Sequence, residues 1–170
     1  MNERSGQPLQ QDGHMNAQSS RDTSVAQIRE LGGLEFLRRI VRGELPQAPI
    51  SATLNFRLAS AEPGVVVFRG TPLRAFYNPM EAVHGGFAAT MLDSALACAI
   101  VSTLEPGYAS TTIEIKINFV RAITDETGEV TAEGRVIHPG KRIATSEAKL
   151  IDAGGKLLAH GTTSCMVMRM

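Results

Sequence analysis

One apolar segment in the middle of the chain constrains the fold more than any other feature of the sequence. Residues 87–104 read FAATMLDSALACAIVSTL, and Asp93 is the only charged residue among them. A segment of about 18 residues is long enough to cross a bilayer, but a carboxylate at mid-membrane costs roughly 2.5–3.5 kcal/mol. Small residues also replace much of the Leu and Ile that a membrane span carries. The segment therefore predicts a buried central helix in a soluble protein.

The composition narrows the class of protein further. The 170 residues carry 17 basic and 17 acidic side chains, and this balance argues against nucleic acid as a partner. Cys98 and Cys165 have no metal-binding spacing, so we expect reduced thiols in a cytoplasmic protein and no metal site. The first residues are polar and lack the apolar core of a signal peptide. We expect a disordered tail over residues 1–23 and a single domain over residues 24–170.

Apolar spacing predicts a second helix before the central one. Val25 to Val41 show helical periodicity, with Ser24 as the N-cap and Gly43 as the stop. Two adjacent glycines, Gly32 and Gly33, are expected to interrupt this helix, and an extended link follows it.

Alternating apolar residues predict six strands. Short turns between most of them indicate antiparallel pairing, and strands that arrive in runs favour an α+β fold over a doubly wound one. We expect a curved antiparallel sheet of about six strands around the central helix, with the N-terminal helix as an addition. The expected strands cover residues 53–58, 65–69, 111–121, 129–138, 142–152 and 156–168. In the third of them the residues expected to face inward are Ile113, Ile115, Ile117 and Phe119.

The start of the central helix is the first candidate site. Gly85 and Gly86 follow His84 there, and backbone N–H groups at a helix N-terminus bind anions or a polarised carbonyl oxygen. An equally good interpretation is that the glycines only permit a tight turn. Asp93 is the second candidate, because a carboxylate inside an apolar helix needs a use or a partner. It is either a catalytic group in a cleft or a buried carboxylate that caps a loop.

The spacing of these two candidates favours a dimer. Gly86 and Asp93 are seven residues apart on one helix face, which places them roughly 10 Å apart along the axis. A reacting carbonyl needs its oxyanion donor and its base each within about 3 Å. A second copy around a two-fold axis brings its own Asp93 beside the first copy's Gly86, which creates two equivalent sites.

A third candidate lies at the turn that contains Gly140, Lys141 and Arg142. Two adjacent cations at a hairpin turn are able to hold phosphates, although a solvated turn is the more common case. The chain has no GxSxG, P-loop or dinucleotide-binding motif, so those enzyme classes lose support.

Three stretches of the sequence resemble a known family. The first stretch is Asn78-Pro-Met-Glu-Ala-Val-His84-Gly85-Gly86, followed by Asp93. The other two are the strand Thr112–Arg121 and Gly140-Lys141-Arg142 with the strand that follows it. All three are similar to the hotdog-fold acyl-CoA thioesterases of the phenylacetate-degradation (PaaI-like) group, which includes one type of 4-hydroxybenzoyl-CoA thioesterase. The resemblance covers roughly residues 54–167. It implies a hotdog fold and hydrolysis of an acyl-CoA thioester.

The resemblance also assigns roles to single residues. It implies that Asp93 of the partner subunit activates water or attacks the thioester, and that the Gly86 N–H polarises the carbonyl. Asn78 would lie near the thioester or orient the water, and His84 would shape the same loop. Thr112 would place a hydroxyl near the carboxylate of the partner subunit. The residues expected near the coenzyme are Gly85, Gly140, Lys141 and Arg142.

The family also sets expectations for partners and cofactors. Coenzyme A is part of the substrate, so no separate cofactor is expected. The resemblance implies a homodimer that pairs again into a dimer of dimers, with neither nucleic acid nor membrane as a partner. Two alternatives on the same fold stay open: a dehydratase or hydratase that acts on acyl thioesters, and a non-catalytic acyl-CoA-binding domain.

Overall fold

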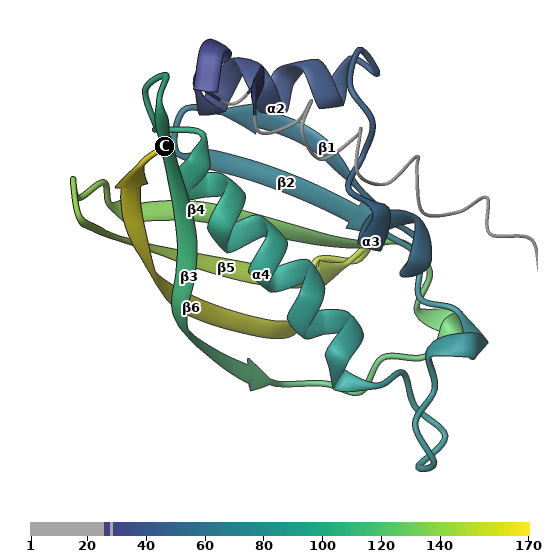
Figure 1. Ribbon diagram of the computed structural model, residues 1–170. Helices are drawn as coiled ribbons and strands as arrows, with labels where there is room; N and C mark the ends of the chain where they lie inside the picture. The colour runs from purple at the N-terminus through teal and green to yellow at the C-terminus, as the bar shows by residue number, and fades with distance from the viewer. Residues whose placement is uncertain (1–25, 28) are drawn as a thin grey trace, which may run out of the picture.

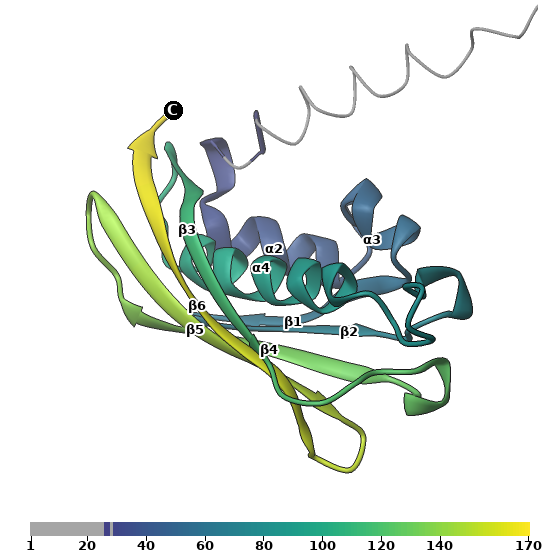
Figure 2. The same ribbon diagram turned by 90° about the horizontal axis from the view of Figure 1, so that it is seen from below.

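A six-stranded antiparallel sheet curves around one long helix in the computed structural model, which describes residues 26–27 and 29–170 (Figures 1 and 2). The expected tail over residues 1–23 and the expected cap Ser24 lie outside these residues. The predicted α+β fold is confirmed. The helices are α2 (Gly33–Val41), α3 (Pro49–Thr53) and α4 (Gly85–Val101), and the strands are β1 (Phe56–Glu62), β2 (Val65–Gly70), β3 (Tyr108–Phe119), β4 (Val130–His138), β5 (Ile143–Asp152) and β6 (Leu157–Arg169).

The order of the strands leaves β1 and β3 at the two edges of the sheet. The order is β1-β2-β4-β5-β6-β3, and every neighbouring pair is antiparallel. The edge at β1 is covered, because the side-chain amide of Gln47 exchanges two hydrogen bonds with the backbone of Leu58 and α2 packs against this strand. The edge at β3 has no neighbouring strand within the described residues.

Helix α4 fills the concave face of the sheet, as its composition predicts. Met91, Leu92 and Leu96 are fully buried against the strands. Gly134 of β4 allows the closest approach, because a Cβ atom at this position would lie 2.2 Å from the carbonyl oxygen of Ala95. The small residues of α4 and the glycine opposite them therefore set the short distance between helix and sheet. None of the helices in the described part of the chain is both long and apolar enough to span a membrane.

The N-terminal helix is interrupted at the predicted place. Residues 26–27 and 29–31 are helical, Gly32 adopts a left-handed φ of 74°, and α2 begins at Gly33. Gly33 packs so tightly on α4 that an added Cβ would lie 1.7 Å from the carbonyl oxygen of Val101. Figure 2 shows α2 and α4 on the same side of the sheet. The two glycines thus bend the chain and let α2 dock beside α4.

The expected strand over residues 53–58 begins too early. Pro49 to Thr53 form the short helix α3, and β1 begins only at Phe56. Pro49 occupies the first helical position, where its fixed φ and missing N–H suit a helix start. The alternation of Leu54, Phe56 and Leu58 suggested a longer strand, but of these three residues Phe56 and Leu58 alone lie in β1, where both are buried. The link before β1 is therefore partly helical instead of extended.

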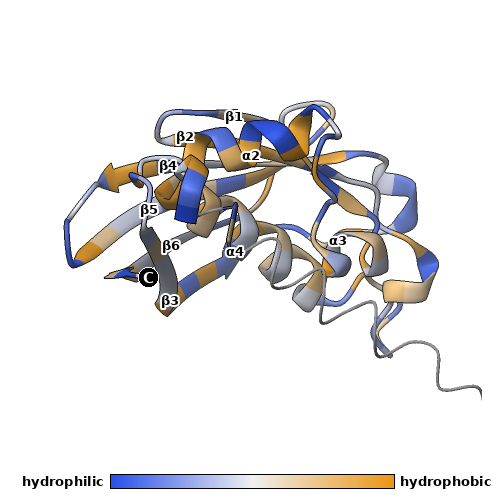
Figure 3. Ribbon diagram, turned by 45° about the horizontal axis from the view of Figure 1, so that its top comes forward, coloured by the Kyte–Doolittle hydropathy of each residue, from blue (hydrophilic) through white to orange (hydrophobic). Residues whose placement is uncertain are grey.

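The expectation of an inward, buried face on β3 is only partly correct. A bulge between Thr112 and Glu114 shifts the register, and Ile113, which lies in it, is 54% exposed. Ile115 and Phe119 lie opposite the buried residues Thr163 and Ala159 of β6, so they point toward the concave face. They remain 37% and 59% exposed in the single chain. Figure 3 shows hydrophobic and hydrophilic residues alternating along this uncovered strand.

Candidate active site

The loop before α4 is held by backbone hydrogen bonds to both of its neighbours. The Val83 N–H donates to the carbonyl oxygen of Ile123 at 2.9 Å, and the His84 N–H donates to that of Phe76 at 2.7 Å. The hydroxyl of Tyr77 donates to Asp125 at 2.5 Å and ties the loop to the segment after β3. These contacts fix the position of the first turn of α4.

The amides at the start of α4 are used differently from the prediction. His84 is the N-cap, and its Nδ1 accepts a hydrogen bond from the Gly86 N–H at 2.8 Å. The amide that was expected to polarise a carbonyl is therefore occupied by a side chain of its own loop. The Gly85 N–H has no acceptor within the described residues. Gly85 is the amide at this helix end that is open to a ligand.

Asn78 presents one half of its side-chain amide to the same region. Its Oδ1 accepts hydrogen bonds from the Met80 N–H at 2.8 Å and the Ala82 N–H at 3.4 Å. The Nδ2 group makes no hydrogen bond within the described part of the chain. Because the carbonyl side of the amide is committed to the loop, the group that Asn78 offers to a ligand is a donor.

A cavity of about 390 Å³ brings three of the predicted residues together. Asn78, His84 and Gly85 line it from the loop, and β3 with the segment after it forms the opposite wall. The ring of Phe119 lies so close to Gly85 that an added Cβ there would be 3.1 Å from it, which is a reason for glycine at this position. The lining also includes Ala82, Val83, Ala88, Val120, Arg121, Ala122, Ile123 and Leu158.

Two wall residues of this cavity had no site role in the sequence-based assignment. Phe119 was expected only to pack in the core. Arg121 was expected as the last residue of the strand over residues 111–121, but it lies in this cavity wall and donates to the carbonyl oxygen of Leu157 at 2.5 Å. No local sequence signal indicates that β3 returns to the start of α4, because this depends on strand order.

Asp93 lies about two turns further along α4 and outside this cavity. It is half-buried, and its Oδ1 accepts a hydrogen bond from the Thr112 hydroxyl at 3.2 Å. Thr112 was expected near the carboxylate of the partner subunit, but the structure places it beside Asp93 of the same chain. The correction follows from the antiparallel course of α4 and β3, which brings the middle of each to the same place.

The thiols near Asp93 are not poised to react. Burial, with a smaller contribution from the Asp93 carboxylate, raises the pKa of the Cys98 thiol to about 12. Burial also raises the pKa of Cys165, although hydrogen bonds from Thr112 and Thr163 oppose this effect. Both cysteines are free. Their protonated thiols leave Asp93 as the group with nucleophilic or basic character in this region.

The turn with Lys141 and Arg142 lies on the Asp93 side of the site. Arg142 is held to β6 because its carbonyl oxygen accepts from the Val167 N–H at 2.8 Å. The next residue, Ile143, pairs with Met166, which in turn pairs with Thr111 of β3. Figure 1 shows the β4–β5 turn and the loop before α4 at opposite ends of the sheet. A Cβ at Gly140 would lie 1.8 Å from the Ile143 carbonyl oxygen, so the tight turn needs this glycine.

The predicted site residues thus form two separate groups within one chain. Asn78, His84 and Gly85 surround a cavity at one end of α4, whereas Asp93 and Thr112 form a pair at its middle. The helix rise puts the two groups roughly 10 Å apart. Within the described residues, no cluster of three or more His, Cys, Asp or Glu is arranged to hold a metal ion.

Comparisons with known proteins identify a family to which part of the chain is similar. The model of the thioesterase superfamily matches residues 80–159, which include the start of α4, Asp93 and the β3 strand. Human acyl-coenzyme A thioesterase 13 is 29% identical over 106 residues, which cover 61% of this chain and 74% of that protein.

Solved structures of relatives share the architecture. A phenylacetic acid degradation-related protein from Ralstonia eutropha is 28% identical, with a TM-score of 0.69, and the match covers 76% of this chain and 98% of that one. The PaaI protein of E. coli is 21% identical with a TM-score of 0.68, and the match covers 79% and 93% of the two chains. The likeness to PaaI confirms the hotdog fold. Residues 80–159 thus match the thioesterase superfamily, and these similarities confirm the expected class of thioester hydrolase.

Proposed function

We propose that the protein hydrolyses an acyl-CoA thioester at a site built from two copies of the chain. One copy supplies Asn78, His84 and Gly85, and the other supplies Asp93 with Thr112. The observation that carries the proposal is the separation of the site residues into two groups within one chain. The open Gly85 amide and the side-chain donor of Asn78 share one cavity, whereas Asp93, with its hydrogen bond from Thr112, lies too far along α4 to reach that cavity. The similarity to human acyl-coenzyme A thioesterase 13 supports coenzyme A as the thiol.

The first group of residues stabilises negative charge. The thioester carbonyl oxygen accepts hydrogen bonds from the Gly85 N–H and from Nδ2 of Asn78. Attack on the carbonyl carbon puts a negative charge on this oxygen, and donors fixed in place before the reaction lower the barrier. Gly86 acts through His84: its N–H holds the imidazole as the cap of α4, which keeps the loop in position.

The second group activates water. Asp93 takes a proton from a water molecule, whose oxygen attacks the thioester carbon. The C–S bond then breaks, the acid is released, and the coenzyme leaves as a thiolate that takes up the proton. Thr112 donates to one carboxylate oxygen and leaves the other free for the water. Because Asp93 is half-buried, its carboxylate attracts more strongly the positive charge that develops on the attacking water.

The uncovered β3 strand supports the dimer. Its edge carries unpaired backbone groups, and Ile113, Ile115 and Phe119 are exposed beside it. Such an edge is a template for pairing with another chain. A two-fold axis perpendicular to β3 pairs the two β3 strands antiparallel, extends the sheet and brings the two α4 helices together in opposite directions. Two such dimers then pair into a tetramer. Lys141 and Arg142 of the copy that supplies Asp93 then lie near the coenzyme phosphates, with Gly140 shaping the turn. We place the reaction in the cytoplasm.

The test is hydrolysis of acyl-CoA by an Asp93→Asn variant. The amide keeps the shape of the side chain but cannot take a proton, so we expect kcat to fall by a factor of about 10²–10⁴, with KM changed much less. Thiol release from a panel of alkyl and aryl acyl-CoAs measures this. Glu147→Gln, an exposed carboxylate of β5, is the matched control. Full activity of the Asp93 variant would disprove its role, and binding of every substrate without hydrolysis by the wild type would favour a binding domain.

A further inference from the structure

Two arginines lie side by side on the β1–β2 hairpin. Arg57 and Arg69 are directly paired in the register of the two strands. Both are exposed, whereas Phe56, Leu58 and Phe68 next to them are buried, so the two guanidinium groups leave the sheet on its outer face. Like charges directly opposite each other across two strands are destabilising. The pair therefore needs an explanation other than sheet stability.

The charge of this arginine pair is only partly neutralised. Glu129 is the carboxylate beside it, and its Oε1 lies 3.7 Å from Nη1 of Arg69. Arg57 makes no ion pair within the described residues. Arg57 shares this lack of an ion pair with some other exposed arginines, whereas a glutamate partner is present for Arg38, Arg39, Arg42, Arg74 and Arg135. One positive charge is thus left over at a site where two cations converge.

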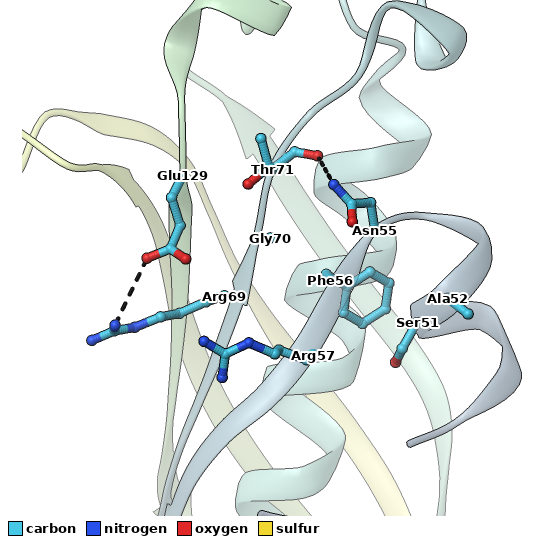
Figure 4. Close-up of a pocket in the computed structure, with 9 residues that line it drawn as sticks. All are labelled: Ser51, Ala52, Asn55, Phe56, Arg57, Arg69, Gly70, Thr71 and Glu129. Atoms are coloured by element: carbon cyan, nitrogen blue, oxygen red, sulfur yellow. Dashed lines mark hydrogen bonds and ion pairs between the residues drawn. The ribbon is translucent and has the colours of Figure 1, made fainter. Parts of the chain in front are cut away.

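The pair lines a pocket of about 230 Å³ between the hairpin and α3 (Figure 4). Figure 4 shows the two guanidinium groups near Glu129 on one side of the view and Ser51 of α3 on the other. Asn55 closes the rim through two hydrogen bonds to Thr71. Its side-chain Nδ2 donates to the backbone carbonyl oxygen of Thr71 at 3.0 Å, and its backbone carbonyl oxygen accepts from the Thr71 N–H at 3.1 Å. The pocket shares no residue with the cavity at Gly85.

We propose that this pocket binds a phosphate group through Arg57 and Arg69. A guanidinium is a planar fork of donors that matches the oxygens of an oxyanion. Two forks on neighbouring strands need more acceptor oxygens than one carboxylate has, and a phosphate supplies at least three. Its negative charge also removes the repulsion between the two cations. The hydroxyl group of the partly exposed Thr71 on the same lining adds a donor for the group that carries the phosphate.

Inorganic phosphate is the first probe, with an Arg57→Gln/Arg69→Gln double variant. Arg135→Gln is the matched control, because Arg135 is also an exposed strand arginine but is paired with Glu133 at 2.8 Å. Thermal unfolding is followed while phosphate replaces chloride at constant ionic strength and millimolar concentration. We expect a saturable rise in Tm for the wild type and the control. The double variant is expected to bind at least tenfold more weakly, since each charged hydrogen bond contributes about 1.5–3 kcal/mol.

The phosphate-free proteins provide the folding control. Removal of two opposed cations relieves repulsion, so the double variant is expected to unfold at the wild-type temperature or above it. The proposal is overturned if the wild type shows no saturable response to phosphate. It is equally overturned if the double variant responds as the wild type does.

A second comparison identifies the compound that carries the phosphate. Coenzyme A and adenosine 5′-monophosphate are titrated against the same three proteins. A larger shift with coenzyme A, lost in the double variant together with a raised KM for acyl-CoA, assigns the phosphate to the substrate. Equal shifts with both compounds, lost in the double variant while KM stays unchanged, assign it to a free phosphate compound. Shifts that persist in the double variant contradict the proposal, whether or not the enzyme hydrolyses acyl-CoA.

Discussion

The hydrogen bond from Thr112 to Asp93 defines the orientation of the proposed catalytic carboxylate. Thr112→Val keeps the shape of the side chain but removes the donor, so Asp93 is free to rotate. We expect kcat to fall about tenfold, because one neutral-to-charged hydrogen bond contributes about 1.5 kcal/mol. Thr112→Ser retains the hydroxyl and should keep most of the activity. Steady-state kinetics of the two variants check this, and equal kcat values for both would contradict a positioning role.

The thiol of Cys98 makes stability depend on pH in the alkaline range. Its pKa is raised from 9.0 to about 12 in the folded protein, mainly by burial. Between these values the unfolded chain has lost the proton and the folded chain still holds it, so stability falls as pH rises. Cys98→Ala removes this contribution. Urea unfolding from pH 8 to 11 should therefore show a flatter decline for the variant, and identical slopes would contradict the assignment.

The contacts made by single side chains in the candidate site could not be predicted from the sequence. The spacing of His84, Gly86 and Asp93 indicated both groups of the candidate site. It did not reveal that His84 would occupy the Gly86 amide, because that depends on the rotamer of one side chain. The family resemblance placed Thr112 near the carboxylate of the partner subunit, and no local spacing indicates that β3 lies beside Asp93 of the same chain.

The packing of α4 on β4 depends on the absence of a side chain at Gly134. Gly134→Ala places a methyl group 2.2 Å from a backbone oxygen of α4, so the helix or the strand has to move. We expect a loss of about 1–3 kcal/mol in the free energy of unfolding. Gly154→Ala, in the exposed turn between β5 and β6, should change stability by no more than about 0.5 kcal/mol. Urea denaturation measures both, and equal losses would contradict the role of close packing.

The elements themselves were largely predictable, for physical reasons. The four strands after α4 follow one another with short turns between them, and the apolar run before Pro106 has no helix-breaking residue after Gly86. The spacing of apolar residues and the position of the turns therefore agreed with the observed elements. Helix α3 was missed, because five residues carry too little periodicity to compete with the alternation at Leu54, Phe56 and Leu58. The exposure of β3 was missed since a strand pattern does not tell whether its cover comes from the same chain.

At the scale of the whole molecule, the account requires two copies of the chain. Neither group of site residues is complete alone, and the β3 edge beside them is uncovered. The same two-fold axis has to satisfy both observations. An Asn78→Ala variant lacks the side-chain donor of one group, and an Asp93→Asn variant lacks the base of the other. Each is expected to be nearly inactive on its own.

Mixing these two inactive variants tests the two-copy site most directly. In a mixed dimer, one site receives Asn78 from one copy and Asp93 from the other, and the second site receives both substitutions. Unfolding the variants together and refolding them should therefore restore about a quarter of the wild-type rate of thiol release, since half of the dimers are mixed and half of their sites are intact. Separately refolded variants that are assayed together without exchange are the control. Activity that stays at the level of the single variants after refolding together would contradict a site shared between two copies.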